Sequence, residues 1–161
     1  MSRLVRVVGG SMAPTFRPSD LLLTRRVGRG GRGVGRGEVV VFRHGGAVMI
    51  KRVVGVGGDR IALEAGKLTI NGDPVDGQPA VRGAYRHTWT VPPGTYFVAG
   101  DNAAVSDDSR VWSEPFVGAA HVQAVVTRRL AQWPARSPLP GWRGVRGFMR
   151  LLRAAATRRI A

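Results

Sequence analysis

The chain has 161 residues, of which 43% are hydrophobic, and its 25 basic and 10 acidic residues give a formal net charge of +15 at pH 7. This length allows one ordinary domain with a core of its own, and the apolar content excludes a disordered polyelectrolyte. There is no cysteine. Disulfides, thiolate metal sites and a cysteine nucleophile are therefore excluded, whereas the redox compartment stays open.

Arginine supplies nearly all of the positive charge, because Lys51 and Lys67 are the only lysines. This excess reflects either a GC-rich genome or an anionic partner, which would be nucleic acid or a lipid surface. No stretch approaches the roughly 20 apolar residues that cross a bilayer. Residues 1–8 also lack the long apolar core of a secretory signal. The sequence predicts a soluble or surface-bound protein with no transmembrane segment.

Short apolar runs separated by glycine and proline predict an all-β domain over residues 1–134. Gly45-Gly46 and Asn71-Gly72 are expected hairpin turns. The Gly/Arg stretch at 28–37 favours a flexible loop over a nucleic-acid-binding arm. No helix is expected before residue 140, apart from a turn after Ser11. Strands are predicted at 3–8, 21–27, 38–42, 47–56, twice within 59–75, and at 89–91, 96–99 and 119–130.

The C-terminal part, 135–161, is predicted to be a linker followed by a basic amphipathic helix over 143–161. Apolar residues recur there at helical spacing, and arginines occupy the opposite side. Such a helix lies in a membrane interface or packs on its own domain, and both interpretations stay open. The apolar stripe comprises Val145, Phe148, Met149, Leu152, Ala156 and Ile160, and the basic side comprises Arg143, Arg146, Arg150 and Arg153.

Several kinds of functional site are disfavoured by the spacing of their candidate residues. The histidines, His44, His87 and His121, do not follow metal-ligand spacing. The glycine-rich stretch lacks the Gly-Lys-Ser/Thr ending of a phosphate-binding loop, and no nucleophile-elbow motif occurs. We therefore expect no metal and no cofactor.

A serine and a lysine are the first candidates for chemistry. Ser11 follows Gly9-Gly10 at the end of a predicted strand, where backbone can approach a substrate and the serine N–H can stabilise an oxyanion. In isolation, a serine that caps a turn explains the same residues. Lys51 lies inside the run 47–54, which is apolar on both strand faces. Burial lowers the pKa of a lysine and makes it a usable base, although the amine can instead reach solvent or pair with a carboxylate.

A polar loop at 100–110 is the third element. Its small, turn-forming and hydrogen-bonding residues follow the apolar strand at 96–99 directly. Such a loop can orient a buried amine and can anchor itself through an Asp–Arg ion pair. Alone, it is also typical of a polar surface loop.

These segments together resemble the sequence boxes of bacterial type I signal peptidases. The resemblance lies in SMAPT, KRVVGVGGD, AGKLTINGDPV and GDNAAVSDDSR, which occur in that order and cover about residues 5–130. It implies an all-β fold with a catalytic domain at 1–134 and a small β insertion at about 60–95. It also implies a serine endopeptidase that uses a Ser/Lys dyad without a metal.

By this resemblance, Ser11 is the nucleophile and Lys51 the general base. Ser106 corresponds to the serine that hydrogen-bonds the lysine amine. Supporting roles fall to the pair Asp108 and Arg110, and to Asp101 and Asn102, which shape the loop. The resemblance also implies residues that contact the substrate. Gly9 stands at an oxyanion-hole position that some members fill with serine, and Met12 lies beside the nucleophile. Met49 and Ile50 line a pocket for a small side chain.

The resemblance also implies the substrate and the location. The substrate is a precursor protein or leader peptide with small residues at an Ala-X-Ala-like site, bound by strand addition beside the Lys51 strand. We expect a membrane-associated enzyme with its active site at the extracytoplasmic face. These enzymes normally have an N-terminal membrane anchor, which is not visible here. Four explanations of this difference stay open. Either the chain is a fragment, or its start is misassigned, or the basic tail does part of the anchoring, or the substrate is not a typical secretory precursor.

Two other functions fit the same sequence. One is a specialised maturation peptidase for a single dedicated precursor. The other is a catalytically inactive basic module that binds anionic lipid or nucleic acid. Nucleic acid is the less favoured partner, because no basic strand carries the interleaved aromatic residues of RNA-binding domains.

Overall fold

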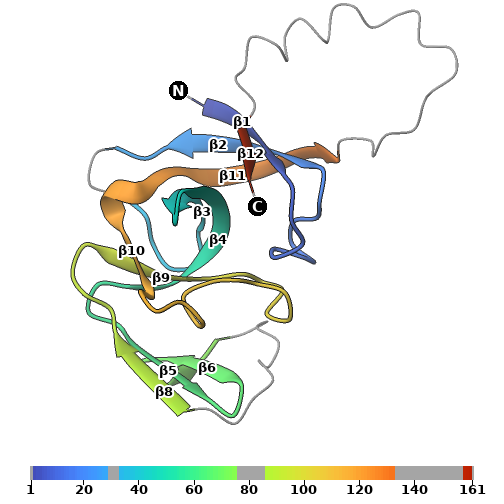
Figure 1. The fold of residues 1–161 in the computed structure, drawn as a ribbon. Helices are drawn as coiled ribbons and strands as arrows, with labels where there is room; N and C mark the ends of the chain where they lie inside the picture. Colours follow the sequence, from blue (N-terminus) through green and yellow to red (C-terminus); the bar gives the residue numbers. More distant parts are fainter. Residues whose placement is uncertain (1, 29–32, 76–85, 133–157, 161) are drawn as a thin grey trace, which may run out of the picture.

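The computed structural model describes residues 2–28, 33–75, 86–132 and 158–160, and these form two β-sheets (Figure 1). The larger sheet has eight strands in the order β10-β9-β4-β3-β11-β2-β1-β12. Neighbouring strands run antiparallel, except that β12 is parallel to β1. Its strands are β1 (Ser2–Val7), β2 (Asp20–Arg26), β3 (Val39–His44), β4 (Ala47–Val56), β9 (Thr95–Ala99), β10 (Phe116–Gly118), β11 (Val122–Gln132) and β12 (Arg158–Ile160).

The large sheet is strongly curled, so that β12 also lies in contact with β4. Its central strands are buried on both faces. In β3, Val39 and Val41 pack in one apolar cluster, while Val40 and Phe42 pack in another. This division follows from the two-residue period of a strand, which sends successive side chains to opposite faces. β4 therefore runs through an environment that is apolar on both sides.

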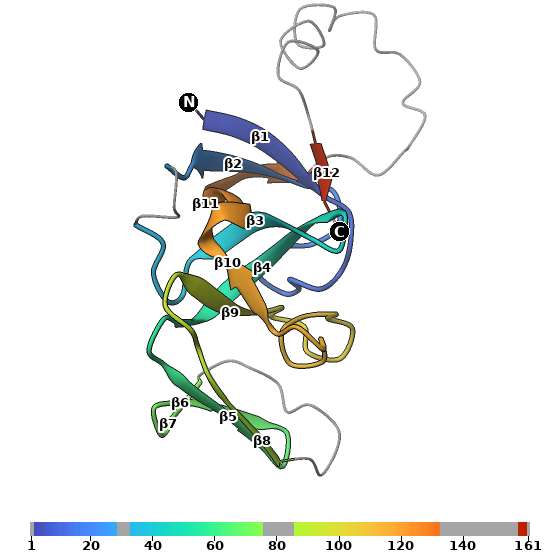
Figure 2. The ribbon, with the colours of Figure 1, turned by 60° about the vertical axis from the view of Figure 1, so that its left-hand side comes forward.

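The smaller sheet has the order β7-β6-β5-β8 and lies at one end of the molecule (Figure 2). Its strands are β5 (Arg60–Glu64), β6 (Lys67–Ile70), β7 (Asp73–Pro74) and β8 (Arg86–Thr90). A third apolar cluster joins the two sheets, with Phe97 of β9 against Ile61 and Leu63 of β5. The Phe97 ring also lies 5.0 Å from that of Trp89, centroid to centroid.

The strand predictions are confirmed in outline. The third and fourth predicted strands form a hairpin at Gly45-Gly46, and Asn71-Gly72 forms the turn between β6 and β7. A second turn, at Ala65-Gly66, joins β5 to β6 with positive φ at both residues, as hairpin turns of this kind require. The segment 59–75 holds three strands rather than the two predicted, and the strand predicted from 119 begins only at 122, after the 3₁₀ turn η1 (Ala119–His121). The sequence did not indicate β10.

The C-terminal helix predicted over 143–161 lies mostly outside the described residues, as do the linker residues 135–140. Its last described part, Arg158–Ile160, forms strand β12 instead. The prediction is wrong there because helical periodicity is a local signal. The outer edge of β1 offers backbone groups that a strand can pair with, and Ile favours strands. In the part of the chain that the structure describes, no helix is long and apolar enough to cross a membrane.

The cluster between the sheets should carry much of the stability. Phe97 is fully buried. Phe97→Ala should lower the free energy of unfolding by about 3–5 kcal/mol, through lost apolar burial and the remaining cavity. Phe16→Ala is the matched control, because it removes the same atoms from a half-buried position. Urea denaturation of both variants measures the free energy of unfolding. An equal decrease in the two variants would contradict the burial assigned to Phe97.

Candidate active site

Ser11 lies in the loop that follows β1. The loop turns tightly, with the Ala13 N–H donating to the Gly10 carbonyl at 3.1 Å and the Phe16 N–H donating to the Met12 carbonyl at 2.8 Å. This is the turn predicted after Ser11. The peptide bond before Pro14 is cis. Ser11 is 8% exposed, so it lies at the boundary between core and solvent.

Lys51 lies in β4 and is 1% exposed, as its apolar run predicted. Its Nζ donates a hydrogen bond to Ser11 Oγ at 2.8 Å. Burial lowers the pKa of Lys51, and the charges of Asp108 and Asp107 oppose this shift without cancelling it. The pair therefore joins the hydroxyl of a residue at the edge of the core to an amine that loses its proton more readily than an exposed lysine.

Asp108 is the centre of a buried hydrogen-bond network behind this pair. Its carboxylate accepts hydrogen bonds from Arg110 Nε at 2.8 Å, from Arg110 Nη2 at 2.6 Å and from the Gly100 N–H at 2.8 Å. It also accepts one from Ser106 Oγ. Arg110 Nη2 in turn donates to the Gly100 carbonyl at 3.2 Å. The ion pair and its bonds fix the path of the loop at 100–110.

This loop holds the Ser11 segment directly. The Asn102 N–H donates to the Ser11 carbonyl at 2.9 Å, and Asn102 Nδ2 donates to the Gly10 carbonyl at 3.2 Å. Gly100 leaves no room for a side chain: a Cβ there would lie 2.2 Å from Ser106 Oγ and 2.5 Å from the Ser11 carbonyl oxygen. The glycine is therefore required for the close packing of the two loops.

Two residues of this network were missed from sequence. Arg52 makes a two-pronged ion pair with Asp101, with Nε to Oδ1 at 2.8 Å and Nη2 to Oδ2 at 2.6 Å, and so ties β4 to the polar loop. Ser109 is fully buried and accepts a hydrogen bond from the Val98 N–H at 2.9 Å. Arg52 gave a usable signal, since it stands beside Lys51 in a segment of few polar residues. Ser109 gave none.

Three implied contacts differ in the structure. Ser106 Oγ donates to Asp108, and among the described residues Lys51 Nζ donates to Ser11 Oγ and not to Ser106. Met12 and Ile50 are fully buried in one apolar cluster, so neither offers surface to a substrate. Met49 keeps 9% of its surface exposed, and Gly9 is half-buried. Asn102 contacts the Ser11 segment directly, Asp108 and Arg110 anchor the loop that carries it, and Asp101 pairs with Arg52 next to Lys51.

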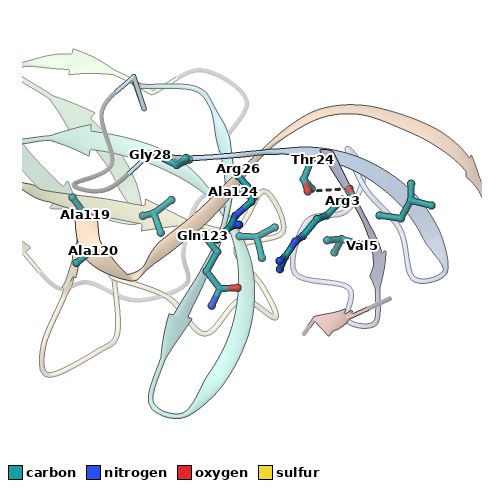
Figure 3. Close-up of a pocket in the computed structure, with 13 residues that line it drawn as sticks. Arg3, Val5, Thr24, Arg26, Gly28, Ala119, Ala120, Gln123 and Ala124 are labelled. Carbon is teal, nitrogen blue, oxygen red and sulfur yellow. Dashed lines mark hydrogen bonds between the residues drawn. The ribbon is translucent and has the colours of Figure 1, made fainter. Parts of the chain in front are cut away.

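A pocket of about 550 Å³ lies elsewhere, between β1, β2 and the start of β11 (Figure 3). Two of the residues that line it are joined by a hydrogen bond, which Thr24 Oγ1 donates to the Arg3 carbonyl at 3.0 Å. None of the predicted site residues lines it. The hydroxyl–amine pair, rather than this pocket, is the candidate for chemistry: a neutral amine beside a hydroxyl can accept its proton and so activate the oxygen as a nucleophile.

Comparison with known proteins identifies the family of the chain. A family model described as "Signal peptidase, peptidase S26" matches residues 1–133. The chain belongs to the signal peptidase family. Signal peptidase I of Pseudomonas aeruginosa is 29% identical to this chain in an alignment of 193 residues. The alignment covers 85% of this chain and 68% of that protein. Signal peptidase I U of Bacillus subtilis is 34% identical over 119 residues, which cover 65% of this chain and 63% of that protein.

Two further matches are also to proteins described as signal peptidases. A probable signal peptidase I-2 of Synechocystis is 32% identical over 131 residues, covering 73% of this chain and 60% of that protein. The crystal structure of a signal peptidase I from Enterococcus faecalis matches 60% of this chain and 98% of that chain, with 28% identity and a TM-score of 0.49. The chain thus spans 60 to 68% of the length of these three curated relatives.

The packing of Gly100 against Ser11 can be tested through stability. Gly100→Ala should lower the free energy of unfolding by about 1–3 kcal/mol, because the new methyl group forces the two loops apart. Gly10→Ala is the matched control, since no atom lies within 4 Å of its Cβ position. Thermal or urea denaturation compares the two. Equal stability of both variants would contradict the packing.

Proposed function

We propose that this member of the signal peptidase family is a serine endopeptidase that removes signal peptides or leader sequences, with Ser11 as nucleophile and Lys51 as general base. The hydrogen bond of 2.8 Å between Lys51 Nζ and Ser11 Oγ carries the proposal. It links the one lysine held inside the core to a serine at the surface boundary. Arginine in place of Lys51 would stay charged at any physiological pH and could not act as a base.

The reaction begins with neutral Lys51. Its amine accepts the Ser11 hydroxyl proton while Oγ bonds to the scissile carbonyl carbon. The tetrahedral intermediate collapses as the C–N bond breaks, and the Lys51 ammonium gives its proton to the leaving amine. Water then attacks the acyl ester and gives a proton to Lys51. The ester C–O bond breaks, Ser11 Oγ takes that proton back, and a carboxylic acid product leaves.

The oxyanion of each intermediate needs a donor. Among the described residues, none accepts a hydrogen bond from the Ser11 N–H, so this group is available. Its position is fixed because Asn102 holds the carbonyl of the same residue. A pre-positioned backbone donor of this kind lowers the barrier without reorganisation during the reaction.

The remaining polar residues position this pair. Asp108 and Arg110 fix the loop, Asp101 holds β4 through Arg52, and Ser106 completes the carboxylate's hydrogen bonds.

In this proposal the catalytic domain spans 1–134, with the second sheet inside an insertion at about 60–95. The substrate is a precursor with small residues at the cleavage site, because Met12 and Ile50 fill the core beside Ser11 and leave little depth there.

The pH dependence of cleavage tests the dyad. A peptide with an Ala-X-Ala site should be cleaved with kcat/KM rising with pH through the lowered pKa of Lys51, because the neutral amine is the active form. Ser11→Ala and Lys51→Arg should each reduce kcat by a factor of about 10³ or more. Cleavage is followed from about pH 6 to pH 10. Undiminished activity in either variant would refute the assignment.

Lys51→Met separates chemistry from folding. The folded protein holds Lys51 with a lowered pKa, so the unfolded chain binds more protons between that pKa and the ordinary value of about 10.4. Wild-type stability should therefore rise with pH across this window. Lys51→Met should be inactive and should lack this rise, while it remains folded because it keeps the apolar stem.

The basic tail supports a second part of the proposal, an anionic membrane surface as partner. Residues 133–161 contain no acidic residue and seven arginines, at 136, 143, 146, 150, 153, 158 and 159. Each basic residue near such a surface contributes about 1 kcal/mol of attraction. This charge favours an enzyme that works at the membrane, and we place its active site on the extracytoplasmic side.

Vesicle sedimentation tests the membrane partner. The full chain should bind vesicles of anionic phospholipid far better than phosphatidylcholine vesicles, and added salt should weaken the binding. Replacing the four arginines at 143, 146, 150 and 153 with Gln should reduce binding by about a hundredfold or more. Equal binding by this variant would place the membrane contact elsewhere. Salt-dependent binding without any proteolysis would favour an inactive binding module.

A further inference from the structure

The outer edge of β1 is the backbone edge that leads to Ser11. One edge of β1 pairs with β2. The other edge pairs with β12 in parallel, with Val5 opposite Arg158 and Val7 opposite Ile160. Since β1 ends at Val7 and the chain continues through Gly9 and Gly10 to Ser11, the parallel strand runs toward the nucleophile.

β12 also reaches the strand that carries the base. Residues of β12 lie in contact with β4, the strand of Lys51, as well as with β1. Both views show β12 beside β1 (Figure 1, Figure 2). The segment therefore occupies the space bounded by the two strands from which Ser11 and Lys51 are presented.

An extended substrate needs this same edge. A peptide that adds to a sheet does so through unpaired backbone N–H and C=O groups. In the eight-strand order, β1 is the strand that would end the sheet on this side if β12 were absent. A substrate strand that pairs with β1 and places its scissile bond at Ser11 cannot coexist with β12 in the same register.

We propose that residues 158–160 are an internal competitor of the substrate: they occupy the strand-docking edge of β1, and a substrate strand must displace them before cleavage. This proposal rests on the proposed function. The competitor is weak, because it pairs over only three residues. Its tether to the domain gives it a high effective concentration nonetheless. Because its pairing is short and its tether keeps it nearby, the segment covers the edge of β1 until a longer substrate strand displaces it.

Competition of this kind has a defined kinetic signature. Because the segment blocks binding and takes no part in chemistry, it raises KM and leaves kcat unchanged. Deleting residues 158–161 from the full chain should lower KM about threefold or more at constant kcat. An unchanged or raised KM would overturn the proposal.

A matched pair of variants separates backbone pairing from charge. Replacing both Arg159 and Ile160 with proline removes their backbone donors and should lower KM as the deletion does. Replacing both with alanine keeps those donors while losing the same side chains, and should leave KM near the wild-type value. If the two variants behave alike, the effect belongs to the side chains and strand competition is wrong.

A readout that needs no proteolysis keeps this test independent of the proposed function. In a Ser11→Ala background, hydrogen exchange of the backbone amides in residues 2–7 should accelerate at least threefold on deletion of 158–161, because the edge of β1 loses its partner. Unchanged exchange would overturn the occupancy itself. If exchange accelerates but no form cleaves any peptide, β12 does cover the edge and the endopeptidase assignment has failed separately.

Discussion

The hydrogen bond between Lys51 and Ser11 is the constraint on which the rest of the structure depends. Keeping an amine from water lowers its pKa toward the range where it can act as a base, but burying it is unfavourable while it is charged. The curled sheet resolves this conflict. β4 is covered on both faces, so Lys51 is buried in its middle without a special cavity. Ser11 lies in the loop after β1, where its hydroxyl accepts a hydrogen bond from the amine.

The acidic residues near Lys51 create a second conflict. A free carboxylate beside the amine would hold it protonated, and Asp108 acts in that direction. The two-pronged pairing of Asp108 with Arg110 reduces this effect, since the guanidinium charge lowers the pKa of Lys51. The network thus gives the loop a hydrogen-bonded anchor and offsets the charge of Asp108 next to Lys51, whereas the charge of Asp107 still favours the protonated amine. In the same way Asp101 is paired with Arg52.

The sequence predicted those features that depend on local pattern. Short apolar runs between glycines and prolines predicted the central strands, paired glycines predicted the hairpin at 45–46, and the apolar residues on both sides of Lys51 predicted its burial. It failed where distant segments decide the outcome. Whether Ile50 lines a pocket or fills the core depends on the loop that carries Met12, and these meet only in the fold. The residues of β12 follow a helical pattern, yet the edge of β1 makes them a strand.

The edge of β1 combines two requirements that oppose each other. A substrate that binds as a strand needs unpaired backbone groups next to Ser11, but an exposed strand edge invites pairing with any other extended chain. A long, stable partner strand would protect the edge and abolish binding, whereas no partner would leave it open to aggregation. A three-residue strand from the same chain satisfies both needs, because it covers β1 at rest and lacks the length to resist a longer peptide. On this argument the weakness of β12 is what makes it compatible with the active site that we propose at the end of β1.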